Sequence, residues 1–126
     1  MAREITVSLS LSVNNGLYSE SFSSGSPQFD QTTQLAHAGV VEIGTAVETI
    51  SLGDVTTAGY AAFRNLSTAT SGTAYIALGR YDGTTLHEFC ALRRGMPAVL
   101  PLSSSATVGA RAYGSATRIR YVVLSE

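Results

Sequence analysis

The two histidines, His37 and His87, have the side chains best suited to act as a general base or a metal ligand near neutral pH. Neither stands at a ligand-like interval from a carboxylate or from the other histidine, and no H-E-x-x-H, G-x-S-x-G or phosphate-loop pattern occurs. The three aspartates and six glutamates are scattered, so two catalytic carboxylates would have to meet by accident in the fold. We therefore predict no catalytic residue, no metal site and no cofactor, and we expect that the protein is not an enzyme.

The basic residues and the cysteine are the next groups that could bind a partner. All eight basic residues are arginine, which suits bidentate and stacked contacts at interfaces. Arg93 and Arg94 follow a predicted strand, where they would either grip a carboxylate on a neighbouring molecule or form a solvated turn. Cys90 stands alone, so no intrachain disulfide can form, and we expect a small buried residue.

The overall composition limits the classes of partner. The chain has 126 residues, 44% of them hydrophobic, and a formal net charge of −1. This length and composition suit one domain, residues 1–126, with a core that needs no disulfide or metal. The charge balance does not attract a polyanion, so we expect no nucleic acid partner. No apolar run approaches the ~20 residues of a membrane helix and no signal-peptide pattern occurs, so we expect a soluble protein that is not a conventional secretory substrate and has no membrane partner.

The stretch that organises the sequence is a predicted hairpin at residues 73–92. The runs TAYIALGRY and TLHEFCAL flank Asp82-Gly83, and this pair predicts a tight turn with positive φ at both positions. Either a two-residue or a four-residue loop gives the same parity, which places Ile76 and Leu78 on one face with Phe89 and Ala91. The other face then carries Tyr75, Ala77, Tyr81, Leu86, Cys90 and Leu92.

Both faces of this predicted hairpin are apolar, which requires cover on both sides. One cover is the partner sheet of the same chain, and we expect a neighbouring subunit to supply the other. The candidate interface residues are Tyr75, Tyr81, Leu86, Leu92, Arg93 and Arg94.

The N-terminal region predicts a second hairpin. Residues 4–13, EITVSLSLSV, alternate apolar and polar side chains and predict a half-buried strand with one wet face. Asn14-Asn15-Gly16 predicts a tight turn with Asn-Gly as the type I′ pair, and residues 17–23 return as a strand. The polar segment that follows is either a loop leading to a strand or an arm that orders only in an assembly. We expect residues 1–35 to offer an arm or edge strand to a neighbouring subunit.

The remaining runs complete an all-β pattern. Residues 40–43 and 47–52 predict two strands or one bulged strand, and residues 60–66 predict another. Pro97 and Pro101 place the run MPAVLPL at a sheet edge. In the last strand, RIRYVVL, Ile119, Tyr121 and Val123 oppose the arginines. We predict an antiparallel, jelly-roll-like β-sandwich of about eight to ten short strands.

Four stretches of the second half, GYAAFRNL, TAYIALG, FCALRRGMPAVLPL and IRYVVLSE, resemble small structural proteins of tailed bacteriophages. In that group an F-x-N-L strand precedes a strand ending in Gly, then L-x-x-G-x-x-A-x-x-x-L, then a strand with Tyr and a terminal acidic residue. The group commonly has Lys-Pro before this glycine and Glu after it, where this chain has Arg93-Arg94 and Met96-Pro97. The matching residues are Phe63, Asn65, Leu66, Gly79, Leu92, Gly95, Ala98, Leu102, Tyr121 and Glu126.

The resemblance implies a non-enzymatic virion protein on a β-sandwich, made in the host cytoplasm and located on the capsid surface. It implies a capsid decoration (cement) protein, a homotrimer whose partners are copies of itself and the major capsid protein. Such a protein would stabilise the shell by binding only its assembled form. The alternative is a carbohydrate- or receptor-binding module of a phage tail or fibre. The position in the virion, the oligomer symmetry, the strand topology and the roles of Cys90, His37 and His87 stay open at this point.

Overall fold

A computed structural model describes residues 3–31, 35–68, 74–103 and 107–125 of the chain, and these residues form strands joined by turns and loops. No helix long and apolar enough to cross a membrane occurs in this described part. The chain divides into two compact units, Met1–Thr33 and Gln34–Glu126. The strands are β1 (Ile5–Thr6), β2 (Ser10–Asn14), β3 (Ser19–Ser23), β4 (Gln28–Phe29), β5 (Ala36–Ile43), β6 (Glu48–Thr49), β7 (Ala58–Asn65), β8 (Tyr75–Tyr81), β9 (Leu86–Leu92), β10 (Pro97–Pro101), β11 (Val108–Tyr113) and β12 (Thr117–Ser125).

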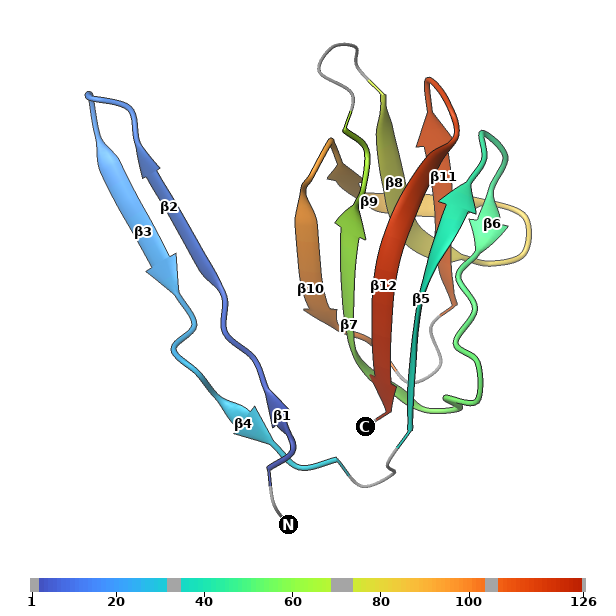
Figure 1. Ribbon diagram of the computed structural model, residues 1–126, viewed down its shortest axis with the longest axis horizontal. Coiled ribbons are helices and arrows are strands. Elements are labelled where there is room, and N and C mark those ends of the chain that lie inside the picture. The colour runs from blue at the N-terminus through green and yellow to red at the C-terminus, as the bar shows by residue number, and fades with distance from the viewer. Residues whose placement is uncertain (1–2, 32–34, 69–73, 104–106, 126) are drawn as a thin grey trace. The chain divides into compact units, whose positions relative to one another are not determined.

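The second unit is a sandwich of two four-stranded antiparallel sheets. The strand orders are β10-β7-β12-β5 and β6-β11-β8-β9 (Figure 1). The antiparallel pairs are nested, since β5 pairs with β12, β6 with β11, β7 with β10 and β8 with β9. This nesting is what rolling up one long hairpin produces, and it defines a jelly roll. The predicted all-β antiparallel sandwich is confirmed, with eight strands here and four in the first unit.

One core fills the space between the two sheets. Ile76, Leu78 and Ala110 reach it from one sheet, and Phe63, Ile119, Tyr121 and Val123 from the other. The predicted grouping of Ile119, Tyr121 and Val123 on one face of the last strand is therefore confirmed, and this face is the inward one. β10 lies at the edge of its sheet, as its prolines predicted, and the runs at 40–43 and 47–52 belong to two separate strands. The predicted loops at 67–72 and 103–105 fall partly outside the described residues.

A β-bulge interrupts the pairing of β8 with β9. Leu78 pairs with Cys90, but the next residue, Gly79, pairs with Glu88, so Phe89 is the extra residue of the bulge. The side chain of Phe89 is 63% exposed. Gly79 lies so close to β9 that a Cβ atom at this position would be 2.0 Å from the carbonyl oxygen of His87.

The bulge decides which side chains of β9 reach the core. Cys90 and Leu92 pack on the core, because one inserted residue moves every later residue to the opposite face of the sheet. The predicted parity, which placed Phe89 and Ala91 beside the core-facing residues of β8, is therefore wrong. The sequence pattern alone carries no mark of the inserted residue.

Asn65, at the end of β7, fixes the turn between β9 and β10. Its side chain is buried, donates to the carbonyl of Leu92 at 2.7 Å and accepts from the amide of Ser67 at 2.8 Å. Its backbone bonds Gly95 and Met96 across the turn, and Gly95 has φ of +73°. A side chain with both a donor and an acceptor is needed here, which only an amide supplies at this length.

The residues that carry the family resemblance stand at positions that the fold itself requires. Phe63 and Leu92 are in the core, Ala98 and Leu102 pack against it, and Gly79 and Gly95 meet backbone requirements. Glu126 lies outside the described residues. The shared pattern is therefore a pattern of fold determinants.

The first unit is a ribbon made of two short antiparallel pairs, β1 with β4 and β2 with β3. The single strand predicted for residues 4–13 is broken into β1 and β2. Its predicted half-buried character is wrong for β2, because every residue of β2 and β3 is exposed, including Leu11 at 72% and Phe22 at 62%.

The two hairpin loops are built alike. Asn15 and Asp82 each open a four-residue loop and accept backbone N–H bonds from the third and fourth loop residues with one side-chain oxygen. The second loop residue is a glycine with positive φ, Gly16 at +85° and Gly83 at +94°, whereas Asn15 and Asp82 do not have positive φ. The two-residue type I′ turn predicted at Asn15-Gly16 and the positive φ predicted for Asp82 are therefore wrong. At the second hairpin the four-residue loop forms, which is one of the two loop lengths that the sequence left open, because the side-chain bonds select it.

We predict that Gly79→Ala destabilises the sandwich by more than about 2 kcal/mol, because the added methyl group would meet rigid backbone of β9. Gly44→Ala is the matched control, since a Cβ atom there meets nothing within 4 Å and the residue has no positive φ. Chemical denaturation of both variants measures the difference. Equal stability of the two variants would show that the bulge can move away at little cost.

Candidate functional site

The outer face of the β6-β11-β8-β9 sheet carries a stack of two tyrosines and two arginines. Tyr75 and Tyr113 are partners in β8 and β11, and their rings stack with centroids 4.8 Å apart. The guanidinium of Arg93 lies 5.7 Å from the Tyr75 ring, and that of Arg111 lies 4.8 Å from the Tyr113 ring. We call these four residues the tyrosine–arginine stack. Cation–π attraction holds such an arrangement together.

Polar contacts fix the Tyr113 end of the stack. The Nε of Arg111 donates to the carbonyl of Thr45 at 2.9 Å, and the hydroxyl of Tyr113 donates to the carboxylate of Glu88. This hydrogen bond raises the pKa of Tyr113, with burial and the negative charge of Glu88 acting in the same direction. Tyr113 therefore stays a neutral donor, and the stack is held as one rigid surface.

The six candidate interface residues do not form one patch. Tyr75 and Arg93 belong to the stack, and Arg94 is exposed in the following turn. Leu92 is only 5% exposed and belongs to the core. Tyr81 and Leu86 are half-buried partners on the outer face, and both pack over Gly109, where a Cβ atom would lie 2.7 Å and 2.9 Å from them.

Sequence reasoning missed Glu88, Arg111 and Tyr113 as members of this surface. The signal was present in the run VGARAY, where the small residues Ala110 and Ala112 alternate with Arg111 and Tyr113. The alanines point to the core, so the large side chains must lie on the outer face. That signal becomes readable only once β11 is known to lie beside β8.

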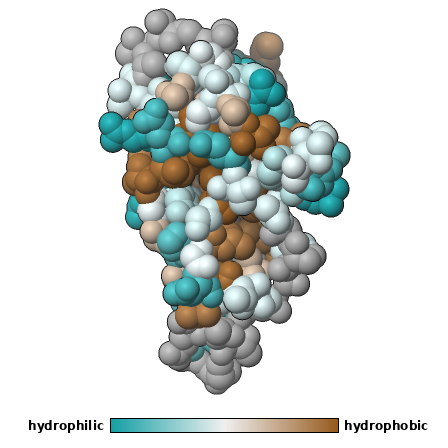
Figure 2. All heavy atoms as spheres, turned by 90° about the vertical axis from the view of Figure 1, so that its right-hand side faces the viewer, coloured by the Kyte–Doolittle hydropathy of each residue, from teal (hydrophilic) through white to brown (hydrophobic). Residues whose placement is uncertain are grey.

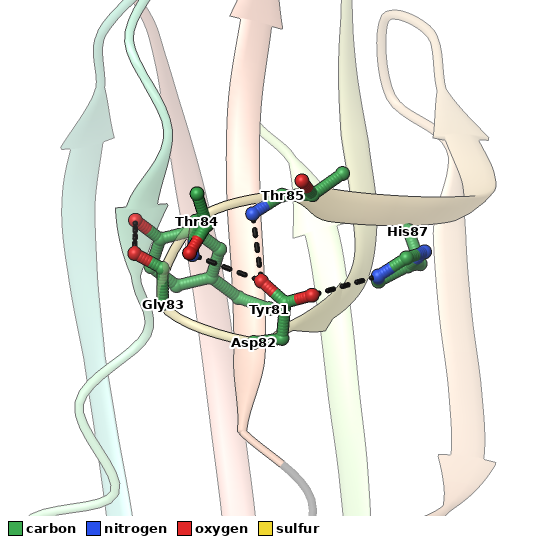
Figure 3. Close-up of polar contacts among 6 residues, drawn as sticks. All are labelled: Tyr81, Asp82, Gly83, Thr84, Thr85 and His87. Atoms are coloured by element: carbon green, nitrogen blue, oxygen red, sulfur yellow. Dashed lines mark hydrogen bonds and ion pairs between the residues drawn. The ribbon is translucent and has the colours of Figure 1, made fainter.

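Asp82 organises the loop at the end of the β8–β9 hairpin (Figure 3). Its carboxylate accepts from the amides of Thr84 and Thr85 at 2.9 Å and 2.7 Å, and lies 3.0 Å from the Nε2 atom of His87. The Thr85 amide, then the His87 side chain and the Thr84 amide, hold the pKa of Asp82 far below its usual range. The His87–Asp82 pair is exposed and shapes the loop.

His37 and Cys90 also have structural surroundings. The Nε2 atom of His37 lies 3.0 Å from the hydroxyl of Tyr121, and its ring packs where a side chain on Gly53 would stand. Burial raises the pKa of the Cys90 thiol, which keeps it protonated and weakly nucleophilic. Within residues 3–31, 35–68, 74–103 and 107–125, no group of three His, Cys, Asp or Glu side chains is placed to hold a metal ion.

The outer face of the other sheet, β10-β7-β12-β5, is largely apolar. Two rows of paired residues cross it without a charged side chain, and a third row adds two arginines. We call this surface the acceptor face. Its rows are Val99, Ala62, Val122 and Ala38; Pro101, Tyr60, Leu124 and Ala36; and Pro97, Arg64, Arg120 and Val40.

The acceptor face has both exposed apolar side chains and a hollow. Val40, on β5, is 55% exposed. Figure 2 views the sandwich from the side where β5 and β6 lie, the edge shared by the two sheets, and hydrophobic residues reach the surface there between polar ones. A depression of about 150 Å³ is lined by residues of β7, β10 and β12, among them Ala62, Val99 and Arg120. Neighbouring exposed apolar side chains on one face of a small protein indicate an interaction site.

The β2–β3 hairpin has two chemically distinct faces. One face carries only serine and asparagine side chains, and the other carries large apolar side chains with one glutamate. We call the second the apolar hairpin face. It comprises Leu9, Leu11, Val13, Tyr18, Glu20 and Phe22, and the polar face comprises Ser10, Ser12, Asn14, Ser19, Ser21 and Ser23.

Comparison of the chain with protein-family models, with curated proteins and with solved structures finds no match. The assignment of a role therefore depends on the surfaces described above.

We predict that Asp82→Asn reduces the loss of stability in acid. The depressed pKa of Asp82 means that its contribution is complete above the pKa of an unfolded aspartate, about 3.9, and is lost as pH falls through the lower folded value. The midpoint temperature of thermal unfolding, measured between about pH 5 and pH 2, should therefore fall more steeply with decreasing pH for the wild type than for the variant.

Asp54→Asn is the control for this experiment, because Asp54 is an exposed aspartate whose side chain bonds none of the described residues. Its profile should follow the wild type. If Asp82→Asn gives the same slope as the wild type, the loop contacts do not stabilise the folded state.

Proposed function

We propose that this protein is a non-enzymatic structural subunit of a bacteriophage virion, a capsid decoration protein that binds the assembled head and stabilises it. The observation that carries the proposal is the amount of apolar surface left open on a small chain, on the hairpin and on the acceptor face. Surfaces of this kind fit a subunit that is complete only inside an assembly.

The resemblance of the second half to small tailed-phage proteins supports the same role. The residues that carry it are fold determinants, so they support a shared β-sandwich, and the exposed surfaces add the reason to associate. In this role the protein forms a homo-oligomer, a trimer, and its second partner is the major capsid protein.

A sugar-binding role at the tyrosine–arginine stack has weaker support. Sugars stack on open aromatic faces, and a tyrosine ring has only two. In the stack, each ring has the other tyrosine against it and a guanidinium over it. The arrangement favours a preformed packing surface over an open platform for a glycan.

Added protein should bind empty heads that lack it and raise the temperature at which they open, because a ligand selective for one state stabilises that state. Purified protein is titrated against such heads, and binding and head opening are followed by sedimentation and dye release. Dissociated major capsid subunits are the control and should not bind.

Quantitative mass spectrometry of purified particles gives an independent measurement. The chain should be present at a fixed ratio to the major capsid protein. Absence from particles, or equal binding to dissociated subunits and to heads, would refute the proposed role.

A further inference from the structure

We propose that the apolar hairpin face of one chain docks on the acceptor face of a second copy. This contact would join chains head to tail, because the two surfaces differ and each chain carries one of each. The inference concerns copies of this chain only, so it stands or falls independently of binding to a capsid.

The first unit by itself leaves the apolar hairpin face without a covering layer. Leu11 and Phe22 are paired across the hairpin and are among the most exposed large apolar residues described. A two-stranded hairpin is marginally stable in water by itself. Because serine and asparagine are all on the opposite face, that polar face suits contact with water and the apolar hairpin face suits contact with another protein surface.

The acceptor face matches the hairpin in kind. It offers apolar rows of small and medium side chains, and the depression over Ala62 and Val122 can receive a larger one. The hairpin supplies larger side chains, Leu11 and Phe22, at neighbouring positions. Each unit by itself leaves its surface exposed, and every second copy of the chain carries the complementary surface at equal concentration.

Charge favours this pairing over a contact between two hairpins. Glu20 is the one charged residue on the apolar hairpin face, and Arg64 and Arg120 are partners at the border of the acceptor face. Neither arginine forms an ion pair with another described residue. Docking on the acceptor face brings opposite charges together, whereas a symmetric contact of two hairpins brings Glu20 near its own copy.

Head-to-tail contacts of this type close into a ring when the rotation between copies allows it. A closed ring uses every hairpin and every acceptor face. Docking of each hairpin on the next acceptor face gives the proposed oligomer a specific interface in which no strand is exchanged between chains.

Sedimentation velocity of the full-length chain over a range of concentrations tests the proposal. The wild type should form a discrete oligomer, and Phe22→Asp should weaken association by at least about tenfold, because a charge would be buried in an apolar contact. Ser21→Asp, which places the same charge on the polar face of the same strand, is the matched control and should associate like the wild type.

A charge exchange identifies the partner surface. Glu20→Arg and Arg120→Glu should each weaken association, since each creates a like-charge contact. An equal mixture of the two full-length variants should recover part of it, because contacts between unlike variants restore the opposite charges. Recovery in the mixture requires contact between different chains. Circular dichroism of each variant verifies that the sandwich is folded.

Three results would overturn the proposal. A wild type that stays monomeric at high concentration rules out self-association. Normal association of Phe22→Asp excludes the hairpin, and normal association of Arg120→Glu excludes the acceptor face.

Discussion

The structure depends on the two-sidedness of β-strands. Alternate side chains of a strand point to opposite faces of a sheet, so a two-layer sandwich buries one face of each sheet and leaves the other outside. In this chain the inner faces are filled by aliphatic and aromatic side chains, and the outer faces are only partly polar. One outer face is covered from within by the tyrosine–arginine stack, and the other keeps its apolar rows open. The outer face of the β10-β7-β12-β5 sheet is therefore the side of the sandwich on which contact with a partner is expected.

Two local features keep the correct side chains on the inner face of each sheet. The bulge at Phe89 lets β9 place Cys90 and Leu92 in the core, and it depends on the absence of a side chain at Gly79. Asn65 then holds the following turn so that β10 can return beside β7. Both features lie where the family resemblance lies. The residues that carry the resemblance are therefore explained by the fold alone, and a functional argument must rest on the surfaces instead.

Much of the fold was accessible from the sequence, because strand alternation and turn residues are local signals. The edge position of β10 followed from Pro97 and Pro101, and the inward face of β12 followed from its alternation. The bulge and the stacking of Tyr113 on Tyr75 did not follow, because each depends on which strands become neighbours. The open apolar surface was expected on the hairpin of residues 75–92. Phe89 of that hairpin is 63% exposed, but a second group of exposed apolar side chains lies on and between β2 and β3, where Leu11 is 72%, Phe22 62% and Leu17 93% exposed. Alternation alone had placed the strand of residues 4–13 half inside a core.

The edges of the sandwich argue for association through faces. Three of its four edge strands resist the addition of another strand: β10 has two prolines, β9 is bulged and β6 has only two residues. β5 is the exception, with eight residues. Strand addition is limited at most of these edges, whereas Leu11, Phe22 and Val40 are exposed on sheet faces, so the faces are the candidate surfaces for contact with a partner. Face contacts are set by side-chain shape and charge, so they can be specific for one partner, whereas an open edge accepts any strand with free backbone groups.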